Sequence, residues 1–303
     1  MTALITGANG FIGQRLLGPK DLGLTRSHSV KPQLVRGDLF DFPSLVSACE
    51  GVDTVFHCAG YAHAFKSSDT NLCWRVNYDG TCNLMTAAAE AGVRRFVFLS
   101  SVKAMAHPGD FCADEEFSGE PVTDYGKSKR AAENVVLEVG AKYGMHVVNL
   151  RLAMVYGLGG RGNLERMARA IQSGWFPPLP ETGNRRSLVH IQDVVEVVRM
   201  VAERPESDGR TYIIADKNAY SGRQIYEHIR AALGLSTKSS FEVPESLLRT
   251  AGRLNNRLGE VVDRLIGSEC YSPARIELEL GWQARVNLSA GLREMFAKTG
   301  DFK

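Results

Sequence analysis

The residues with the clearest chemical potential are a tyrosine and a lysine four positions apart, in the segment Tyr125-Gly-Lys-Ser-Lys129. On a helix this spacing places both side chains on one face. A phenol with an ordinary pKa of about 10 is a poor base at neutral pH, but a neighbouring cation favours the phenolate. The pair is therefore suited to exchanging a proton with a hydroxyl or carbonyl oxygen. A surface pair of this spacing also occurs by chance, so the interpretation needs a third group.

Two serines supply that group. Ser100 and Ser101 end an apolar run that begins at Phe96 and is typical of a buried strand. In a parallel sheet, ligands gather at the carboxyl ends of the strands. A serine hydroxyl there can bind the substrate oxygen that exchanges a proton with Tyr125, although a serine that only caps a loop is the simpler alternative.

A glycine-rich turn near the N-terminus predicts a second site. It follows an apolar run, Ala3–Thr6, and precedes a helical pattern. Glycines in this context permit a tight turn and a close approach of the backbone to a pyrophosphate, so we expect a dinucleotide here. The residues assigned to the turn are Gly7, Asn9, Gly10, Phe11, Ile12 and Gly13.

The choice between NAD and NADP depends on the end of the second strand, about 20 residues further on. The sequence there is Leu24-Thr25-Arg26-Ser27, in which the guanidinium of Arg26 can meet a 2′-phosphate. We therefore favour NADP slightly and leave NAD open. Asp38 is a candidate partner for the adenine amino group.

The elements that must position these residues alternate between short apolar runs and amphipathic segments, which predicts a doubly wound α/β Rossmann sheet. The expected strands are 3–6, 33–36, 54–59, 96–101 and 147–150, and the expected helices are 11–17, 44–50, 71–91, 124–142 and 188–204. We expect residues 1–156 and 187–217 to form this dinucleotide-binding domain. Residues 157–186 and 218–303 would form a smaller, mostly helical substrate domain.

Composition is that of an ordinary soluble enzyme, with 44% hydrophobic and 23% charged residues and a net charge of +2. This balance predicts no nucleic-acid partner, and no apolar run approaches the roughly 20 residues that cross a bilayer, so we expect no membrane partner. We expect no signal peptide and no metal site. We also expect a cytoplasmic enzyme with reduced thiols, and a homodimer is left open. The cysteines concerned are Cys49, Cys58, Cys73, Cys82, Cys112 and Cys270.

The sequence resembles the extended short-chain dehydrogenase/reductases, particularly their nucleotide-sugar epimerase/dehydratase branch. Besides the glycine turn and Tyr125–Lys129, the motifs that carry the resemblance are 37–39 (GDL), 57–60 (HCAG), 76–81 (VNYDGT), 98–101 (FLSS), 151–157, 186–191 (RSLVHI) and 279–282 (ELGW). The resemblance implies a catalytic trio of Ser101, Tyr125 and Lys129. It also implies cofactor contacts at Leu39, Cys58, Ala59 and Gly60, a bracing role for Asn77, and substrate contacts at Asn163 and Arg186.

The sequence also departs from the family pattern. Ala104-Met-Ala106 stands where many relatives have Val-Tyr-Gly, and no proline follows Arg151. The segment 101–103 (SVK) lacks the carboxylates with which sugar 4,6-dehydratases eliminate water, so we discount dehydration.

Two reactions at C4 of a nucleoside-diphosphate sugar then remain side by side, epimerisation and reduction of a 4-keto sugar. The alternative is an alcohol or 3β-hydroxysteroid-type dehydrogenase with the same trio, and a non-catalytic Rossmann sensor is a third possibility. The basic loop 184–186 favours a diphosphate over an apolar substrate, and the retained trio argues against a sensor.

Overall fold

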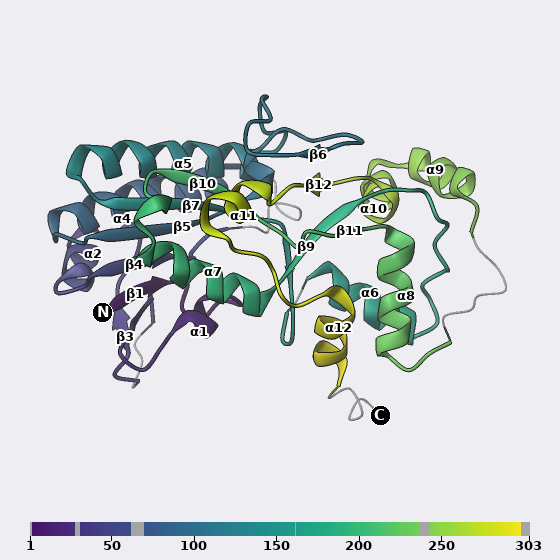
Figure 1. Cartoon of the computed structure of the whole chain (residues 1–303), viewed down its shortest axis with the longest axis horizontal. Helices are drawn as coiled ribbons and strands as arrows, with labels where there is room; N and C mark the ends of the chain where they lie inside the picture. Colours follow the sequence, from purple (N-terminus) through teal and green to yellow (C-terminus); the bar gives the residue numbers. More distant parts are fainter. Residues whose placement is uncertain (1, 28–30, 62–69, 161, 237–242, 298–303) are drawn as a thin grey trace.

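The computed structural model describes residues 2–27, 31–61, 70–160, 162–236 and 243–297. Its larger part is a seven-stranded sheet in which every strand pair is parallel (Figure 1). In spatial order the strands are β10 (Arg210–Ile214), β7 (His146–Leu152), β5 (Arg95–Ser101), β4 (Thr54–His57), β1 (Ala3–Thr6), β2 (Leu22–Thr25) and β3 (Leu34–Arg36). The chain runs outward from β1 to β3 and then returns to β4 on the other side of β1. This confirms the doubly wound fold and places its switch point between β1 and β4.

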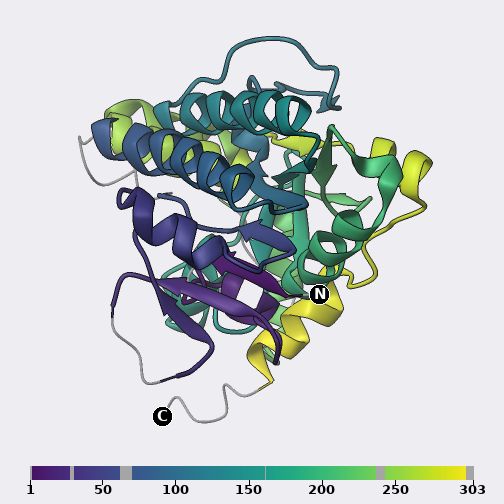
Figure 2. The ribbon, with the colours of Figure 1, turned by 90° about the vertical axis from the view of Figure 1, so that its left-hand side faces the viewer.

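Both faces of the sheet are covered by helices (Figure 2). One face packs on α2 (Phe42–Cys49), α4 (Gly80–Glu90) and α5 (Asp124–Tyr143), and the other packs on α1 (Gly13–Leu16), α7 (Ile191–Glu203) and α11 (Ala274–Leu280). Adjacent residues of a strand point to opposite faces of the sheet. In β1, Leu4 packs on the face covered by α2, α4 and α5, and Ile5 packs on the face covered by α1, α7 and α11. Near-continuous apolar strands are what a sheet buried on both faces requires.

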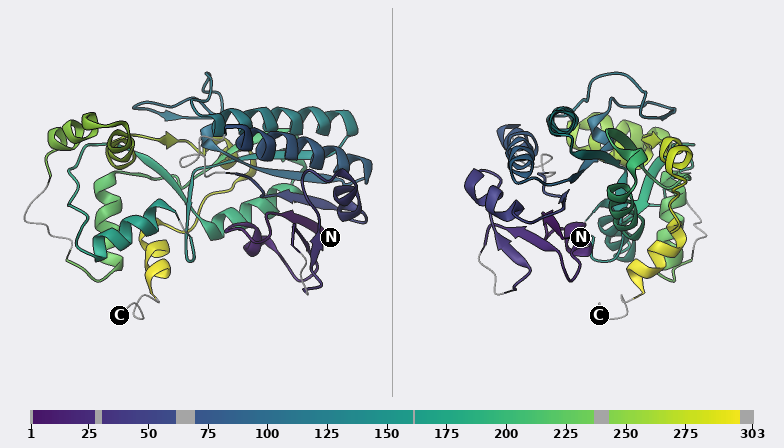
Figure 3. Two further views of the ribbon diagram at one scale, coloured as in Figure 1. Left: turned by 180° about the vertical axis from the view of Figure 1, so that it is seen from behind. Right: turned by 60° about the vertical axis from the view of Figure 1, so that its left-hand side comes forward.

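A smaller sheet continues from the carboxyl end of β7. Its strands are β8 (Met154–Tyr156), β9 (Arg186–His190) and β11 (Ala219–Tyr220). Around it lie α6 (Asn163–Gln172), α8 (Gly222–Ala232), α9 (Glu245–Leu254), α10 (Asn256–Ile266) and α12 (Leu288–Phe296), and α9 and α10 sit at the end of the molecule farthest from the N-terminal strands (Figure 3).

Two helix predictions need correction. The helix expected over 188–204 begins only at Ile191, because residues 186–190 pair with β8 and β11 as the central strand of the small sheet. The helix expected over 71–91 is divided into α3 (Thr70–Trp74), a π-helical turn (Arg75–Asp79) and α4. Such π-turns occur often at functional sites, and this one contains Asn77.

Helix α5 is capped and placed by local residues. The Thr123 side chain accepts a hydrogen bond from the Gly126 N–H, which caps the first turn. A Cβ on Gly126 would lie 2.1 Å from the Lys103 carbonyl oxygen, so glycine permits the helix to approach the segment after β5. This approach brings Tyr125 and Lys129 to the carboxyl end of that strand.

The prediction of six reduced thiols is wrong for one pair. Cys112 of β6 (Cys112–Ala113) and Cys270 of β12 (Cys270–Tyr271) face each other across a parallel strand pair and form a disulfide, with their Cα atoms 4.4 Å apart. The residues are 158 positions apart, so only folding brings them together. The cysteines therefore no longer argue for a reducing compartment. Within the described ranges, no helix is both long and apolar enough to cross a membrane.

Candidate active site

The glycine-rich turn lies at the carboxyl end of β1 and is shaped by backbone contacts. Gly7 has φ +64°, and a Cβ added to Gly13 would lie 2.2 Å from the Gly7 carbonyl oxygen. The Gly10 N–H donates to that same oxygen at 2.8 Å. A Cβ on Gly7 would lie 2.9 Å from the Ala59 nitrogen, so both positions require glycine, and a backbone without side chains fits the close approach of a pyrophosphate. Phe11 and Ile12 lead from the turn into α1.

The residues expected to meet the adenosine end lie along the same edge of the sheet. Arg26 follows β2 directly and is exposed, and the Asn9 amide donates to the Thr25 hydroxyl at 3.5 Å. After β3, the Asp38 carboxylate accepts the Phe40 N–H at 3.0 Å. The Leu39 carbonyl accepts a hydrogen bond from Asn83 of α4 at 2.8 Å. The structure thus brings Asn9, Arg26, Asp38 and Leu39 to one edge.

A buried hydrogen-bond chain holds the segment after β4. The Thr81 hydroxyl donates to the Asn77 carbonyl at 2.6 Å, so it accepts from His57 Nε2 at 2.9 Å. His57 Nδ1 is then the acceptor for the Thr6 hydroxyl at 2.6 Å, and Thr6 Oγ1 accepts the Ala59 N–H at 3.1 Å. Burial lowers the pKa of His57 to about 3, which keeps the ring neutral. This series of hydrogen bonds holds Cys58 and Ala59 next to Gly7 of the glycine turn.

Asn77 extends this support to helix α5. Its Oδ1 accepts the Tyr61 N–H at 2.8 Å, and its Nδ2 donates to the Ser128 hydroxyl at 3.1 Å. A Cβ on Gly60 would lie 3.3 Å from Lys129 Nζ, so glycine leaves room for the lysine head group. Asn77 is therefore a brace between the cofactor side and the helix that carries Tyr125 and Lys129.

Ser101, Tyr125 and Lys129 meet at the end of β5. Burial raises the pKa of Tyr125, and the hydrogen bond with Ser101 partly opposes that increase. Lys129 Nζ donates to the Leu99 carbonyl at 2.8 Å and lies 4.4 Å from the centre of the Phe98 ring. Burial lowers the pKa of Lys129 to about 8. The Lys129 head group is thus directed at β5. The sequence predicts that this lysine lowers the pKa of Tyr125, but in the structure burial raises that pKa.

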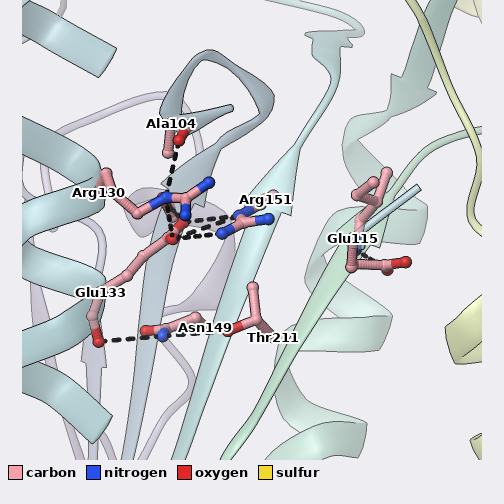
Figure 4. Close-up of polar contacts among 9 residues, drawn as sticks. Ala104, Glu115, Arg130, Glu133, Asn149, Arg151 and Thr211 are labelled. Carbon is pink, nitrogen blue, oxygen red and sulfur yellow. Dashed lines mark hydrogen bonds and ion pairs between the residues drawn. The ribbon is translucent and has the colours of Figure 1, made fainter. Parts of the chain in front are cut away.

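The neighbouring Ser100 has a different partner. Its hydroxyl donates to the buried Glu133 carboxylate at 2.5 Å, and Glu133 also binds Arg151 and Arg130 (Figure 4). Because this carboxylate engages Ser100, Ser101 is the serine that remains at Tyr125.

A cavity of about 270 Å³ opens beyond the end of β7. Ser101 pairs in register with Leu152, and Met154, two residues further on, lies in the cavity wall. The lining is mainly apolar but includes three arginines, and it consists of Met154, Asn163, Leu164, Arg166, Met167, Ala170, Phe176, Leu179, Arg186, Gly222, Ile225, Val261, Arg264 and Leu265. Both predicted substrate residues, Asn163 and Arg186, are in this wall.

Two charged residues near the site escaped the sequence analysis. Glu269 pairs with Arg186 at 3.3 Å and also with Lys103, two positions after Ser101. In the sequence, Lys103 is distinguished only by the lack of a carboxylate in the segment 101–103, and Glu269 belongs to none of the motifs. The two residues are 166 positions apart, so no local sequence pattern indicates that they pair.

A doubly wound sheet with a glycine turn at its switch point, and a serine, tyrosine and lysine at a nearby strand end, defines an enzyme of the extended short-chain dehydrogenase/reductase class. The chain belongs to the NAD dependent epimerase/dehydratase family, whose model matches residues 3–215.

Known relatives of similar length differ in reaction. A UDP-glucose 4-epimerase of Vibrio cholerae is 28% identical over 312 residues, covering 96% of this chain and 93% of the relative. A 2-alkyl-3-oxoalkanoate reductase of Stenotrophomonas maltophilia is 26% identical over 331 residues, covering 99% of each. Among solved structures, MoeE5 in complex with UDP-glucose and NAD has a TM-score of 0.78 at 25% identity, covering 99% of this chain and 98% of the other.

Proposed function

We propose that the protein catalyses hydride transfer at C4 of a nucleoside-diphosphate sugar, as a 4-epimerase or a 4-keto-sugar reductase. The observation that carries the proposal is the hydrogen-bonded Ser101–Tyr125 pair at the end of β5. It is supported by a cavity whose wall holds three arginines and Met154, two residues beyond the strand partner of Ser101. The V. cholerae relative is an epimerase of this type, and MoeE5 binds UDP-glucose and NAD.

The described residues fit a nicotinamide dinucleotide. The cradle formed by Gly7, Gly10 and Gly13 excludes side chains. A Cβ on Gly60 would come within 3.3 Å of Lys129 Nζ, so this glycine keeps space free beside the lysine. When bound, the cofactor supplies or takes up the hydride. We propose NAD or NADP, with Arg26 as the group that would favour NADP.

Each catalytic residue then has a distinct task. Tyr125 exchanges the proton at the sugar 4-oxygen, and Ser101 donates a hydrogen bond to that oxygen. Lys129, one helical turn further along α5, places a positive charge on the same helix face, which favours the phenolate when a proton leaves. Arg186 and Asn163 bind the diphosphate side of the substrate from the cavity wall. In this proposal the diphosphate contacts come from the substrate domain (157–186 and 218–303), whereas the dinucleotide site and the catalytic trio belong to the other domain (1–156 and 187–217).

An alcohol or 3β-hydroxysteroid-type dehydrogenase is the second candidate, and the many apolar side chains in the cavity wall favour it. An uncharged substrate would leave the guanidinium groups of Arg166, Arg186 and Arg264 without a role in binding. For this reason we rank the nucleotide sugar first.

The proposal is tested by titrating the enzyme with UDP and dTDP in a calorimeter and by incubating it with UDP-sugars and each cofactor. A 4-epimerase interconverts the two C4 epimers without net consumption of cofactor, whereas a reductase consumes NADH or NADPH in proportion to a 4-keto sugar. Failure of both nucleotides to bind at millimolar concentration would reject the nucleotide-sugar assignment and favour the alcohol or steroid alternative.

A further inference from the structure

Glu269 lies between a lysine from the catalytic strand end and an arginine from the cavity wall. One carboxylate oxygen pairs with Lys103 Nζ, and the other lies 3.3 Å from Nη2 of Arg186. The Lys103 N–H donates to the Ser101 hydroxyl oxygen at 3.2 Å. A single carboxylate therefore connects the Ser101 segment to the predicted substrate arginine.

The contacts of Arg186 with the protein all involve the two terminal nitrogens of its guanidinium group. Nη1 donates to the carbonyls of Gly267 at 3.2 Å and Asp263 at 3.5 Å, and Nη2 donates to Glu269. A guanidinium has five N–H donors. Among the described residues, none accepts a hydrogen bond from Nε–H, and Nη2 has Glu269 as its single acceptor. Nε–H and the second N–H of Nη2 can together form a side-on fork. Since Arg186 lines the cavity, this fork is available to an anion there.

Glu269 is itself held firmly. Its N–H donates to the Arg185 carbonyl at 2.7 Å, and its carbonyl accepts the Ser187 N–H at 3.0 Å. The next residue, Cys270, is joined to Cys112 by the disulfide. Burial alone would raise the pKa of Glu269, but Lys103 and Arg186 outweigh it and hold the pKa below its usual range. The side chain is therefore an ionised, fixed carboxylate at neutral pH.

We propose that Glu269 is a positioning residue for the substrate: it holds the end-on edge of Arg186 so that the side-on fork meets the diphosphate. Lys103 holds the second oxygen of Glu269, which aligns the diphosphate contact with the strand end that carries Ser101. This inference rests on the proposed function and adds Glu269 and Lys103 to its substrate-binding apparatus.

An opposite role for Glu269 makes the proposal testable. If the carboxylate merely neutralised Arg186 and had to be displaced by the diphosphate, its removal would tighten nucleotide binding. If Glu269 orients Arg186, its removal weakens binding, because a loosened guanidinium loses the bidentate geometry.

The experiment compares Glu269→Gln, Lys103→Met and Lys103→Arg with wild type in calorimetric titrations of UDP and of the dinucleotide. Glu269→Gln should weaken UDP binding by about 10-fold, Lys103→Met should weaken it by at least about 3-fold, and Lys103→Arg should restore it. Dinucleotide affinity should stay within about 2-fold, and with a turned-over substrate KM should rise more than kcat falls. Glu245→Gln, which removes an ion pair with Arg249 on α9, is the matched control and should leave UDP binding unchanged.

Unchanged or tighter UDP binding by Glu269→Gln would overturn the proposal, as would a lowered melting temperature with no change in UDP affinity. If Glu269→Gln does not fold, Lys103→Met and Lys103→Arg decide the question by the same measurement. Absence of UDP binding to the wild-type enzyme would reject the proposed function and this inference together. UDP binding by the wild type that Glu269→Gln does not weaken would reject this inference alone.

Discussion

Glu133 of α5 and Arg151 of β7 form a buried ion pair next to the end of β5, with Arg151 Nη2 2.8 Å from Glu133 Oε2 (Figure 4). Their side chains are only 2% and 7% exposed, and Glu133 has a further, longer contact of 3.5 Å with Arg130. Ser100 also binds Glu133, and Lys129 lies one helical turn before it. The pair therefore ties together two strands and the helix that carries Tyr125 and Lys129.

Arg151→Met should lower the free energy of unfolding by about 3–5 kcal/mol, because it removes the closest counter-charge of the buried Glu133 carboxylate and leaves the longer contact of 3.5 Å with Arg130. The double variant Glu133→Gln/Arg151→Met should recover part of the loss. Arg249→Met breaks an exposed pair on α9 and should cost less than about 1 kcal/mol. Urea unfolding measures all three, and a loss below about 1 kcal/mol for Arg151→Met would contradict the prediction.

Tyr125→Phe should reduce turnover by at least about 100-fold and leave dinucleotide affinity nearly intact, since it removes only the proton-exchanging oxygen. Steady-state kinetics and fluorescence titration with the dinucleotide test the two halves separately. Phe176→Leu, a change in the cavity wall, is a control for altered packing and should spare dinucleotide affinity too. Wild-type turnover by Tyr125→Phe would remove Tyr125 from the mechanism.

The buried Lys129 predicts a pH-dependent stability. Its pKa falls from an ordinary 10.5 to about 8, so between these values the unfolded chain binds a proton that the folded protein does not. Stability therefore rises as pH increases from about 8 to about 10.5, and below pH 8 the full cost, on the order of 3 kcal/mol, is present. Lys129→Met should exceed wild type in unfolding free energy at pH 7, and the difference should shrink by pH 10. A difference that is constant with pH would show that Lys129 does not titrate in this range.

Arg26→Ala tests the cofactor preference. The loss of the guanidinium should weaken NADPH binding by about 10-fold or more and leave NADH binding nearly unchanged, because only NADPH carries a 2′-phosphate. Competitive titration of both cofactors gives the ratio. Equal losses for the two would mean that Arg26 is not the selector.

The disulfide predicts a thiol count and a stability effect. The unfolded, unreduced protein should show four reactive thiols, and the reduced protein should show six. Cys112→Ser should lower the unfolding free energy by about 2–4 kcal/mol, because it frees a long loop in the unfolded chain. Cys82→Ser, at a half-buried free thiol, is the matched control. Six reactive thiols without reductant would show that the two sulfurs are not bonded.

The sequence by itself determined the parts whose information is local. The strands at 3–6 and 96–101 were predictable because each contains an uninterrupted apolar run, Ala3–Ile5 and Phe96–Leu99, as a doubly covered sheet requires. The glycine turn was predictable because its constraints are largely local: Gly7 has a positive φ, and Cβ atoms on Gly10 and Gly13 would meet the Gly7 carbonyl oxygen. Tyr125 and Lys129 were predictable as a pair because four residues make one helical turn.

Tertiary structure alone decided which distant groups became partners. Neither Lys103 nor Glu269 has a periodic or motif signal, and only folding across 166 residues pairs them. The same holds for the Cys112–Cys270 pair and for β9, whose residues continue an amphipathic helical pattern but pair with strands from elsewhere in the chain. Local sequence restricts backbone conformation, whereas a partner is selected by the shape and charge of surfaces that exist only once the elements have packed.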